Sequence, residues 1–152
     1  MAKDKAKKRV STPAVPRKET PHRLALPGAE NSDARICWRF CHVDHDGPWG
    51  FGKVDAPMLR DILDKLAHFE SMTINELFNF SSYPGTDYDV ASLPTTAALD
   101  RLEEIGLSDM TKIHRLRLRG ERRLYGFLVG HVFHVVWWDP NHEIWPSKLK
   151  HT

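Results

Sequence analysis

Basic residues, tyrosine and histidine gather near the carboxyl end of the chain. Arginine recurs at Arg115, Arg117 and Arg119, and Arg123 and Tyr125 follow shortly after. Arginine stays protonated in proteins, so it can bind phosphate and stabilise negative charge but cannot act as a base. Histidine titrates near neutral pH and can move protons. A surface that combines these residue types would suit a phosphate backbone.

Three consecutive strands must position these side chains. Apolar residues alternate with other residues over 113–119, 122–129 and 132–138, and glycine-containing pairs separate the three segments. Unpaired arginines inside a core would be very costly, so we assign them to the face that points away from it. The opposite, core-facing set is then Leu116, Leu118, Leu124, Leu128, Phe133, Val135 and Trp137.

The rest of the chain supplies one strand and two or three helices. Residues 35–43 alternate as a strand, with Ile36, Trp38, Phe40 and His42 toward the core. Asp55-Ala56-Pro57 starts a helix that runs to about residue 70. A capping box at 73–76 opens a short helix, and a third helix starts at Thr95 or Thr96 and stops at Gly106. We expect residues 81–94 to form a loop.

This order of elements predicts an α+β fold. The N-terminal strand and the three-strand meander would form a small antiparallel sheet, with two to three helices packed on one face. The other face would stay open, and it would carry the arginines.

Composition indicates one domain with a tail. The chain has 152 residues, a net charge of +2 and no apolar run near the roughly 20 residues of a membrane helix. Residues 1–33 are basic and proline-rich without apolar periodicity, so we expect a disordered tail before a single domain at 34–152. No secretory signal is recognisable, which makes the cytoplasm the default location.

A second group of residues could bind zinc. Cys37, Cys41, His42 and His45 have suitable ligand types, but on a strand Cys41 and His42 would point to opposite faces. The alternative is two buried thiols and two loop histidines. Two cysteines in one short segment give no disulfide framework.

The chain resembles the RelE/ParE superfamily of bacterial toxins over roughly residues 34–147. The resemblance lies in the element order and in short motifs: Arg115-Leu116-Arg117-Leu118-Arg119, then Arg123-Leu124-Tyr125, and finally His142-Glu143-Ile144-Trp145. Two positions depart from the family pattern. His142 stands where the family usually has Arg, and Trp145 where it commonly has Tyr.

The resemblance implies a type II toxin that cleaves mRNA on the ribosome and is neutralised by a cognate antitoxin. In this class the 2′-hydroxyl of the substrate attacks the adjacent phosphate, and the mechanism needs no metal or other cofactor. The protein supplies a base, positive charge for the phosphorane and an acid. The catalytic candidates are Arg123, His142, His134 and Tyr125.

The RNA-binding candidates carry a positive charge or an indole ring that can stack on a base, a contact worth roughly 1–3 kcal/mol. They are Arg115, Arg117, Arg119, Arg122, Trp138, Trp145, Lys148 and Lys150. Simpler interpretations stay open, since an arginine strand can be a solvated face and a tryptophan a packing residue. The alternative function is a non-catalytic module of the same fold that inhibits a protein such as gyrase or binds nucleic acid.

Overall fold

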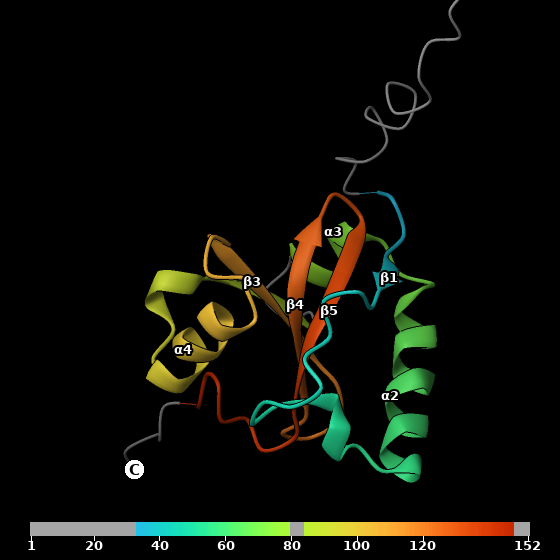
Figure 1. Ribbon diagram of the computed structural model, residues 1–152. Coiled ribbons are helices and arrows are strands. Elements are labelled where there is room, and N and C mark those ends of the chain that lie inside the picture. The colour runs from blue at the N-terminus through green and yellow to red at the C-terminus, as the bar shows by residue number, and fades with distance from the viewer. Residues whose placement is uncertain (1–32, 80–83, 148–152) are drawn as a thin grey trace, which may run out of the picture.

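The computed structural model of the chain describes residues 33–79 and 84–147. A five-stranded mixed sheet forms its centre, in the order β1-β5-β4-β3-β2 (Figure 1). The strands are β1 (Cys37–Arg39), β2 (Gly85–Asp89), β3 (Lys112–Arg117), β4 (Arg123–Val129) and β5 (Val132–Asp139). β1 runs parallel to β5, and the other neighbouring strands are antiparallel. The predicted tail up to residue 32, and the candidates Lys148 and Lys150, lie outside the described residues.

The expected helices form, and their capping residues act as expected. They are α2 (Ala56–Phe69), α3 (Ile74–Phe78) and α4 (Thr96–Glu104), with short 3-10 turns η1 (Phe51–Lys53) and η2 (Val90–Ser92). The carboxylate of Asp55 accepts the N–H of Met58 at 2.8 Å, and the Thr73 hydroxyl accepts the N–H of Glu76 at 3.2 Å. Gly106 takes a φ of +75° just beyond α4, a conformation that glycine adopts without a steric penalty.

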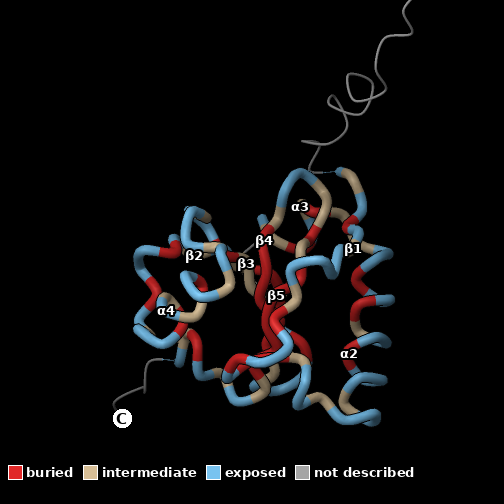
Figure 2. Tube along the Cα trace, viewed as in Figure 1, coloured by how far each residue is buried: buried red, intermediate tan, exposed pale blue. Residues whose placement is uncertain are grey.

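Helices cover both faces of the sheet. α2 and α3 pack on one face with Leu116, Leu124 and Phe133, whereas α4 packs on the other face with Tyr125 and Trp137. Figure 2 shows the buried strands between α2 and α4. The predicted α+β class is confirmed, and two helices share one face as expected. The third helix partly covers the face that we expected to be open.

One predicted loop is a strand, and one predicted strand is shorter. β2 lies within the expected loop 81–94 and pairs over its whole length with residues 112–116 of β3. Its sequence, Gly-Thr-Asp-Tyr-Asp, has a single large apolar residue and no apolar alternation, so the pairing partner decides its conformation. β1 ends at Arg39 because the chain turns, with the N–H of Val43 donating to the carbonyl of Phe40 at 3.2 Å. Phe40 and His42 are therefore exposed rather than in the core.

A bulge in β5 explains why the predicted faces of Trp137 and Trp138 are wrong. Tyr125 pairs with Trp137 but Gly126 pairs with Val135, which leaves Val136 as an extra residue on β5. The extra residue reverses the alternation, because successive side chains of a strand otherwise point to opposite faces. Trp137 therefore lies in the core beside α4. Trp138, predicted for the opposite face, takes the core position beside α2 that was predicted for Trp137.

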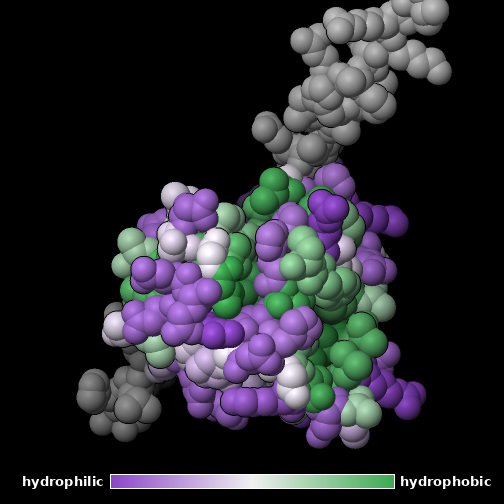
Figure 3. All heavy atoms as spheres, viewed as in Figure 1, coloured by the Kyte–Doolittle hydropathy of each residue, from purple (hydrophilic) through white to green (hydrophobic). Residues whose placement is uncertain are grey.

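An apolar groove flanks α2. Leu59 and Leu63 on α2 are 44% and 52% exposed, and Phe40, after β1, is 53% exposed. These side chains line a groove between α2 and the segment that follows β1. Figure 3 shows the apolar atoms beside this helix. Within the described residues, no helix has the length and apolar character needed to span a membrane.

Candidate functional site

Four of the predicted site residues share the sheet face that carries α4. Arg115 pairs with Tyr125 across β3 and β4, and Arg117 pairs with Arg123 one step further along. Arg123 in turn pairs with Asp139 at the end of β5. Directly paired residues project to the same side of a sheet, so these strands place the arginines and the tyrosine in one group. The assignment of the arginines to one face from alternation is correct here.

The segment after β5 brings His142 to this group. Both carboxylate oxygens of Asp139 accept backbone N–H groups, from Glu143 at 3.0 Å and Ile144 at 2.9 Å. The Thr95 hydroxyl, next to α4, lies 3.2 Å from the carbonyl of Glu143 and 2.8 Å from that of Ile144. These contacts fix a tight turn in which His142 has a φ of 58°. A positive φ is uncommon for a non-glycine residue and persists where the surrounding structure imposes it.

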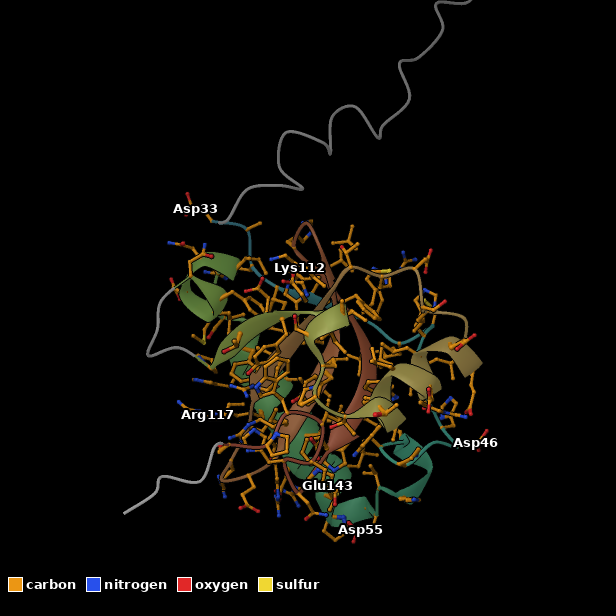
Figure 4. The ribbon with its side chains drawn as sticks, turned by 90° about the vertical axis from the view of Figure 1, so that its left-hand side faces the viewer. Asp33, Asp46, Asp55, Lys112, Arg117 and Glu143 are labelled. Atoms are coloured by element: carbon orange, nitrogen blue, oxygen red, sulfur yellow. The ribbon has the colours of Figure 1, made fainter. Side chains whose placement is uncertain are left out.

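His142 makes direct contact with the arginine group. Its Nε2 lies 3.4 Å from a terminal nitrogen of Arg115, and its Nδ1 lies 3.4 Å from the hydroxyl of Ser147. Figure 4 shows Arg117 on one side of the molecule and Asp46 on the other, with Glu143, the next residue after His142, between them. We call Arg115, Arg117, Arg123, Tyr125 and His142 the arginine cluster.

Two aromatic rings border the arginine cluster. Tyr88 and Trp145 stack with their centroids 4.0 Å apart and their planes at 13°. The Arg115 guanidinium lies 5.3 Å from the centroid of Tyr88, which is a cation–π contact. Trp145 thus stacks on a protein ring rather than standing free for a base. Sequence reasoning missed Tyr88 because β2 was expected to be a loop.

The arginine cluster holds more positive charge than the protein neutralises. Within residues 33–79 and 84–147, Arg115, Arg117 and Arg123 make no ion pair. Asp139 is fully buried and already holds two backbone N–H groups. Arg123 is only 8% exposed, and one of its terminal nitrogens donates to the carbonyls of Gly120 at 2.6 Å and Arg122 at 3.0 Å.

Some buried polar atoms of this cluster remain unpaired. Arg115 Nε, Arg123 Nε and the Tyr125 hydroxyl have no hydrogen-bond partner among the described residues. A buried cation or donor without a partner is costly, so native proteins seldom keep one without a reason. An anion bound by the guanidinium groups would offer acceptors to the two Nε donors, whereas the fully buried Tyr125 hydroxyl lies out of its reach.

The surroundings set the protonation states that proton transfer needs. Burial lowers the pKa of His142, and the positive charges of Arg123 and Arg115 lower it further. His142 is therefore a neutral imidazole at neutral pH and can accept a proton. Burial raises the pKa of Tyr125 well above its usual value, so this hydroxyl stays protonated and does not act as a base.

No family model, curated protein or solved structure matches the chain. The chemistry that this site can perform is therefore inferred from its residues and their geometry.

The structure places three other RNA-binding candidates outside the arginine cluster. Arg119 is exposed in the turn between β3 and β4, and Arg122 pairs with Asp61 of α2 at 3.1 Å. Trp138 is 3% exposed on the α2 face, where its indole N–H donates to the sulfur of Met58 at 2.9 Å. Its ring cannot stack on a base, which corrects that prediction.

His134 also lies apart from the arginine cluster. It pairs with Arg39 of β1, and its ring lies 5.7 Å from that of His42. Asp139 lies five positions further along β5, a distance of about 16 Å at strand spacing. Burial and the charges of His42 and Arg39 lower its pKa, so none of these influences comes from the arginine cluster. His142 thus remains as the histidine that can serve the arginine site.

The structure brings together only two of the four residues that the sequence offered as zinc ligands. Cys37 and Cys41 are both exposed free thiols, not the buried thiols of the alternative interpretation. Cys41 and His42 come together with His134, while Cys37 and His45 lie outside this group. The thiol of Cys37 instead points toward the carbonyl of His131 at 3.8 Å.

Proposed function

We propose that the chain is an RNA-cleaving toxin of the RelE kind and that the arginine cluster is its active site. The observation that carries this proposal is the contact between Arg115 and a neutral His142, beside an Arg123 that makes no ion pair among the described residues. Unpaired guanidinium groups favour a phosphate, since they offer several donors in a planar fork. A neutral imidazole next to that phosphate can serve as the base.

The proposed reaction uses the 2′-hydroxyl of the RNA as nucleophile. When Arg115 turns from Nε2 of His142 to the phosphate, Nε2 takes the 2′-hydroxyl proton, the 2′-oxygen bonds to phosphorus, and the bond to the 5′-oxygen breaks. Arg115 and Arg123 stabilise the negative charge that develops on the phosphorane. The departing 5′-oxygen is protonated by solvent, because Tyr125 has no exposed surface through which to reach it. Tyr125 instead supports Arg115 from the strand beneath.

The resemblance to RelE toxins supplies the proposed biological setting. The substrate would be mRNA on the ribosome, and a cognate antitoxin would hold the activity in check by covering the positive cluster. Arg117, which is exposed at the rim, would contact the RNA backbone outside the scissile phosphate. The cytoplasm is the compartment in which these partners meet.

Induced expression with mapping of mRNA 5′ ends tests the proposal. We expect wild-type protein to arrest growth and to produce new 5′ ends, and His142→Asn to abolish both. Asparagine removes the base but tolerates the positive φ of this position better than most residues. General-base catalysis contributes typically 10²–10⁴-fold, so cleavage by purified protein should fall by about that factor.

Arg60→Gln provides the matched control, because Arg60 is exposed on α2, on the other face of the sheet. It should cleave like wild type, and both variants should keep the wild-type melting temperature. Growth that is unaffected by wild-type expression would refute a toxin. A growth arrest with intact mRNA would point to a non-catalytic module that acts on a protein such as gyrase.

A further inference from the structure

Three side chains that commonly bind metals meet at the opposite end of β5 from the arginine cluster. The Cys41 sulfur and one ring nitrogen each from His42 and His134 all lie within 4.8 Å of one another. Cys41 and His42 follow β1, whereas His134 comes from β5, more than 90 positions later in the chain. None of the three contacts the residues proposed for RNA cleavage.

The fold brings these side chains together through two anchors on β5. β1 pairs with β5 at Arg39 and His134, and the N–H of Asp44 returns to β5 by donating to the carbonyl of Val136 at 3.0 Å. Between the anchors the chain makes the turn closed by Val43 and Phe40. Figure 1 shows this segment passing across β5.

On a strand the neighbouring residues Cys41 and His42 would point to opposite faces, but the structure places them in a turn. Cys41 and His42 occupy its two central positions, where the backbone reverses direction and neighbouring side chains need not diverge as they do along a strand. Both side chains are exposed and can rotate, while His134 projects from a paired strand. The site therefore has one fixed ligand and two adjustable ones.

The ligand chemistry fits zinc. A thiolate and two imidazoles are typical zinc ligands, and bonds of about 2.0–2.3 Å place tetrahedral ligand atoms roughly 3.3–3.6 Å apart. Movements of about 1 Å at the two exposed side chains would bring the present spacing into that range. A second observation also points to a ligand: Nδ1 of His134 is buried and has no hydrogen-bond partner among the described residues.

We propose that Cys41, His42 and His134 form a zinc-binding site whose fourth coordination position is taken by water. The metal would fasten the turn after β1 to the edge of the sheet. Its water would face the hollow that Cys41 and His42 line together with Asp46 and Arg101. This site is separate from the arginine cluster, and the proposed RNA cleavage does not depend on it.

Cobalt substitution of the purified full-length chain tests this site directly. We expect one Co²⁺ per chain, with a sulfur-to-cobalt charge-transfer band and the intense visible bands of tetrahedral coordination. Zinc should displace the cobalt and remove these bands. Cys41→Ser should abolish the charge-transfer band, and His134→Gln should raise the zinc dissociation constant by more than the roughly 10–100-fold typical of losing an outer-shell partner.

Two control variants separate this ligand set from the one expected from sequence. Cys37→Ser and His45→Gln should bind cobalt and zinc like the wild type, because neither residue lies in the group. Loss of the charge-transfer band in Cys37→Ser would overturn the proposal, as would a wild-type chain without the band at stoichiometric cobalt. Circular dichroism of each variant identifies any that fails to fold. If Cys41→Ser or His134→Gln does not fold, His42→Gln replaces it as the ligand variant and should weaken metal binding in the same way.

Discussion

Two charged groups on the α4 side of the sheet differ in how their charges are satisfied. In the first, Asp44 is 4% exposed and receives two hydrogen bonds from Arg101 at 2.8 Å each. The indole N–H of Trp137 adds a third at 3.0 Å, and the backbone N–H groups of Asp46 and Gly47 add two more. Every acceptor position of this carboxylate is used by the protein itself.

The arginine cluster is the opposite case. Its arginines make no ion pair among the described residues. Arg123 carries its charge at 8% exposure, and the oxygens of the nearby Asp139 already accept two backbone N–H groups. The comparison teaches how to separate structural charges from functional ones. A buried charge whose partners are complete stabilises the fold, whereas one with open donors is prepared for a group that arrives from outside.

The largest expected effect is a loss of stability when Asp44, whose hydrogen-bond partners are complete, is replaced. Asp44→Ala should lower the free energy of unfolding by about 3–5 kcal/mol, because it leaves two nitrogens of the partly buried Arg101 and the buried indole N–H of Trp137 without an acceptor. Arg101 then keeps only its contact with the exposed Glu104. Urea unfolding measures this loss. Asp46→Ala is the control, since Asp46 is exposed and should change stability by less than about 0.5 kcal/mol. A loss below about 1 kcal/mol for Asp44→Ala would remove the basis of the comparison.

The second prediction concerns Arg123 in the arginine cluster. Arg123→Met should leave the free energy of unfolding within about 1 kcal/mol of wild type, since it replaces an uncompensated buried charge with an apolar side chain of similar length. RNA cleavage should fall by about 10²–10³-fold, the usual cost of removing one donor to a developing oxyanion. Both quantities can be measured on the same preparation. A destabilisation as large as that of Asp44→Ala would make the arginine cluster structural.

The third prediction concerns how the stabilisation by Asp44 depends on pH. The hydrogen bonds from Arg101 hold the pKa of Asp44 well below its usual value, against the opposing effect of burial. The unfolded chain therefore binds more protons in acid, so the stabilisation is complete above about pH 4 and is lost as the pH falls below it. The difference in unfolding free energy between wild type and Asp44→Asn should shrink by about 2 kcal/mol from pH 4 to pH 2. A difference independent of pH would show that the charge of Asp44 contributes nothing.

Sequence reasoning found the features that local chemistry determines. The N-caps Asp55 and Thr73 and the stop at Gly106 all act as expected, because each involves residues within one turn of the helix end. The grouping of Arg115, Arg123 and Tyr125 also follows from the sequence, since alternation along β3 and β4 is uninterrupted there.

The remaining features depend on contacts between distant segments. The bulge at Val136 arises from pairing between β4 and β5, where a Cβ at Gly126 would collide with the carbonyl of His134. No residue type marks the extra position on β5, so the faces of Trp137 and Trp138 could not be predicted. Likewise, β2 becomes a strand only because β3 offers it a partner, and Tyr88 enters the site with it.

Tyr88 gives the smallest expected effect and separates a supporting residue from a catalytic one. Tyr88→Leu removes the stack with Trp145 and the contact with Arg115, which together should cost about 1 kcal/mol of stability and less than about tenfold in cleavage rate. Tyr88→Phe keeps the ring and should match wild type in both assays. Because burial raises the pKa of Tyr88, its hydroxyl stays protonated and is not available as a base. If Tyr88→Phe nevertheless lost as much cleavage as Arg123→Met, the hydroxyl of Tyr88 would take part in the chemistry, and proton transfer would not rest on His142 alone.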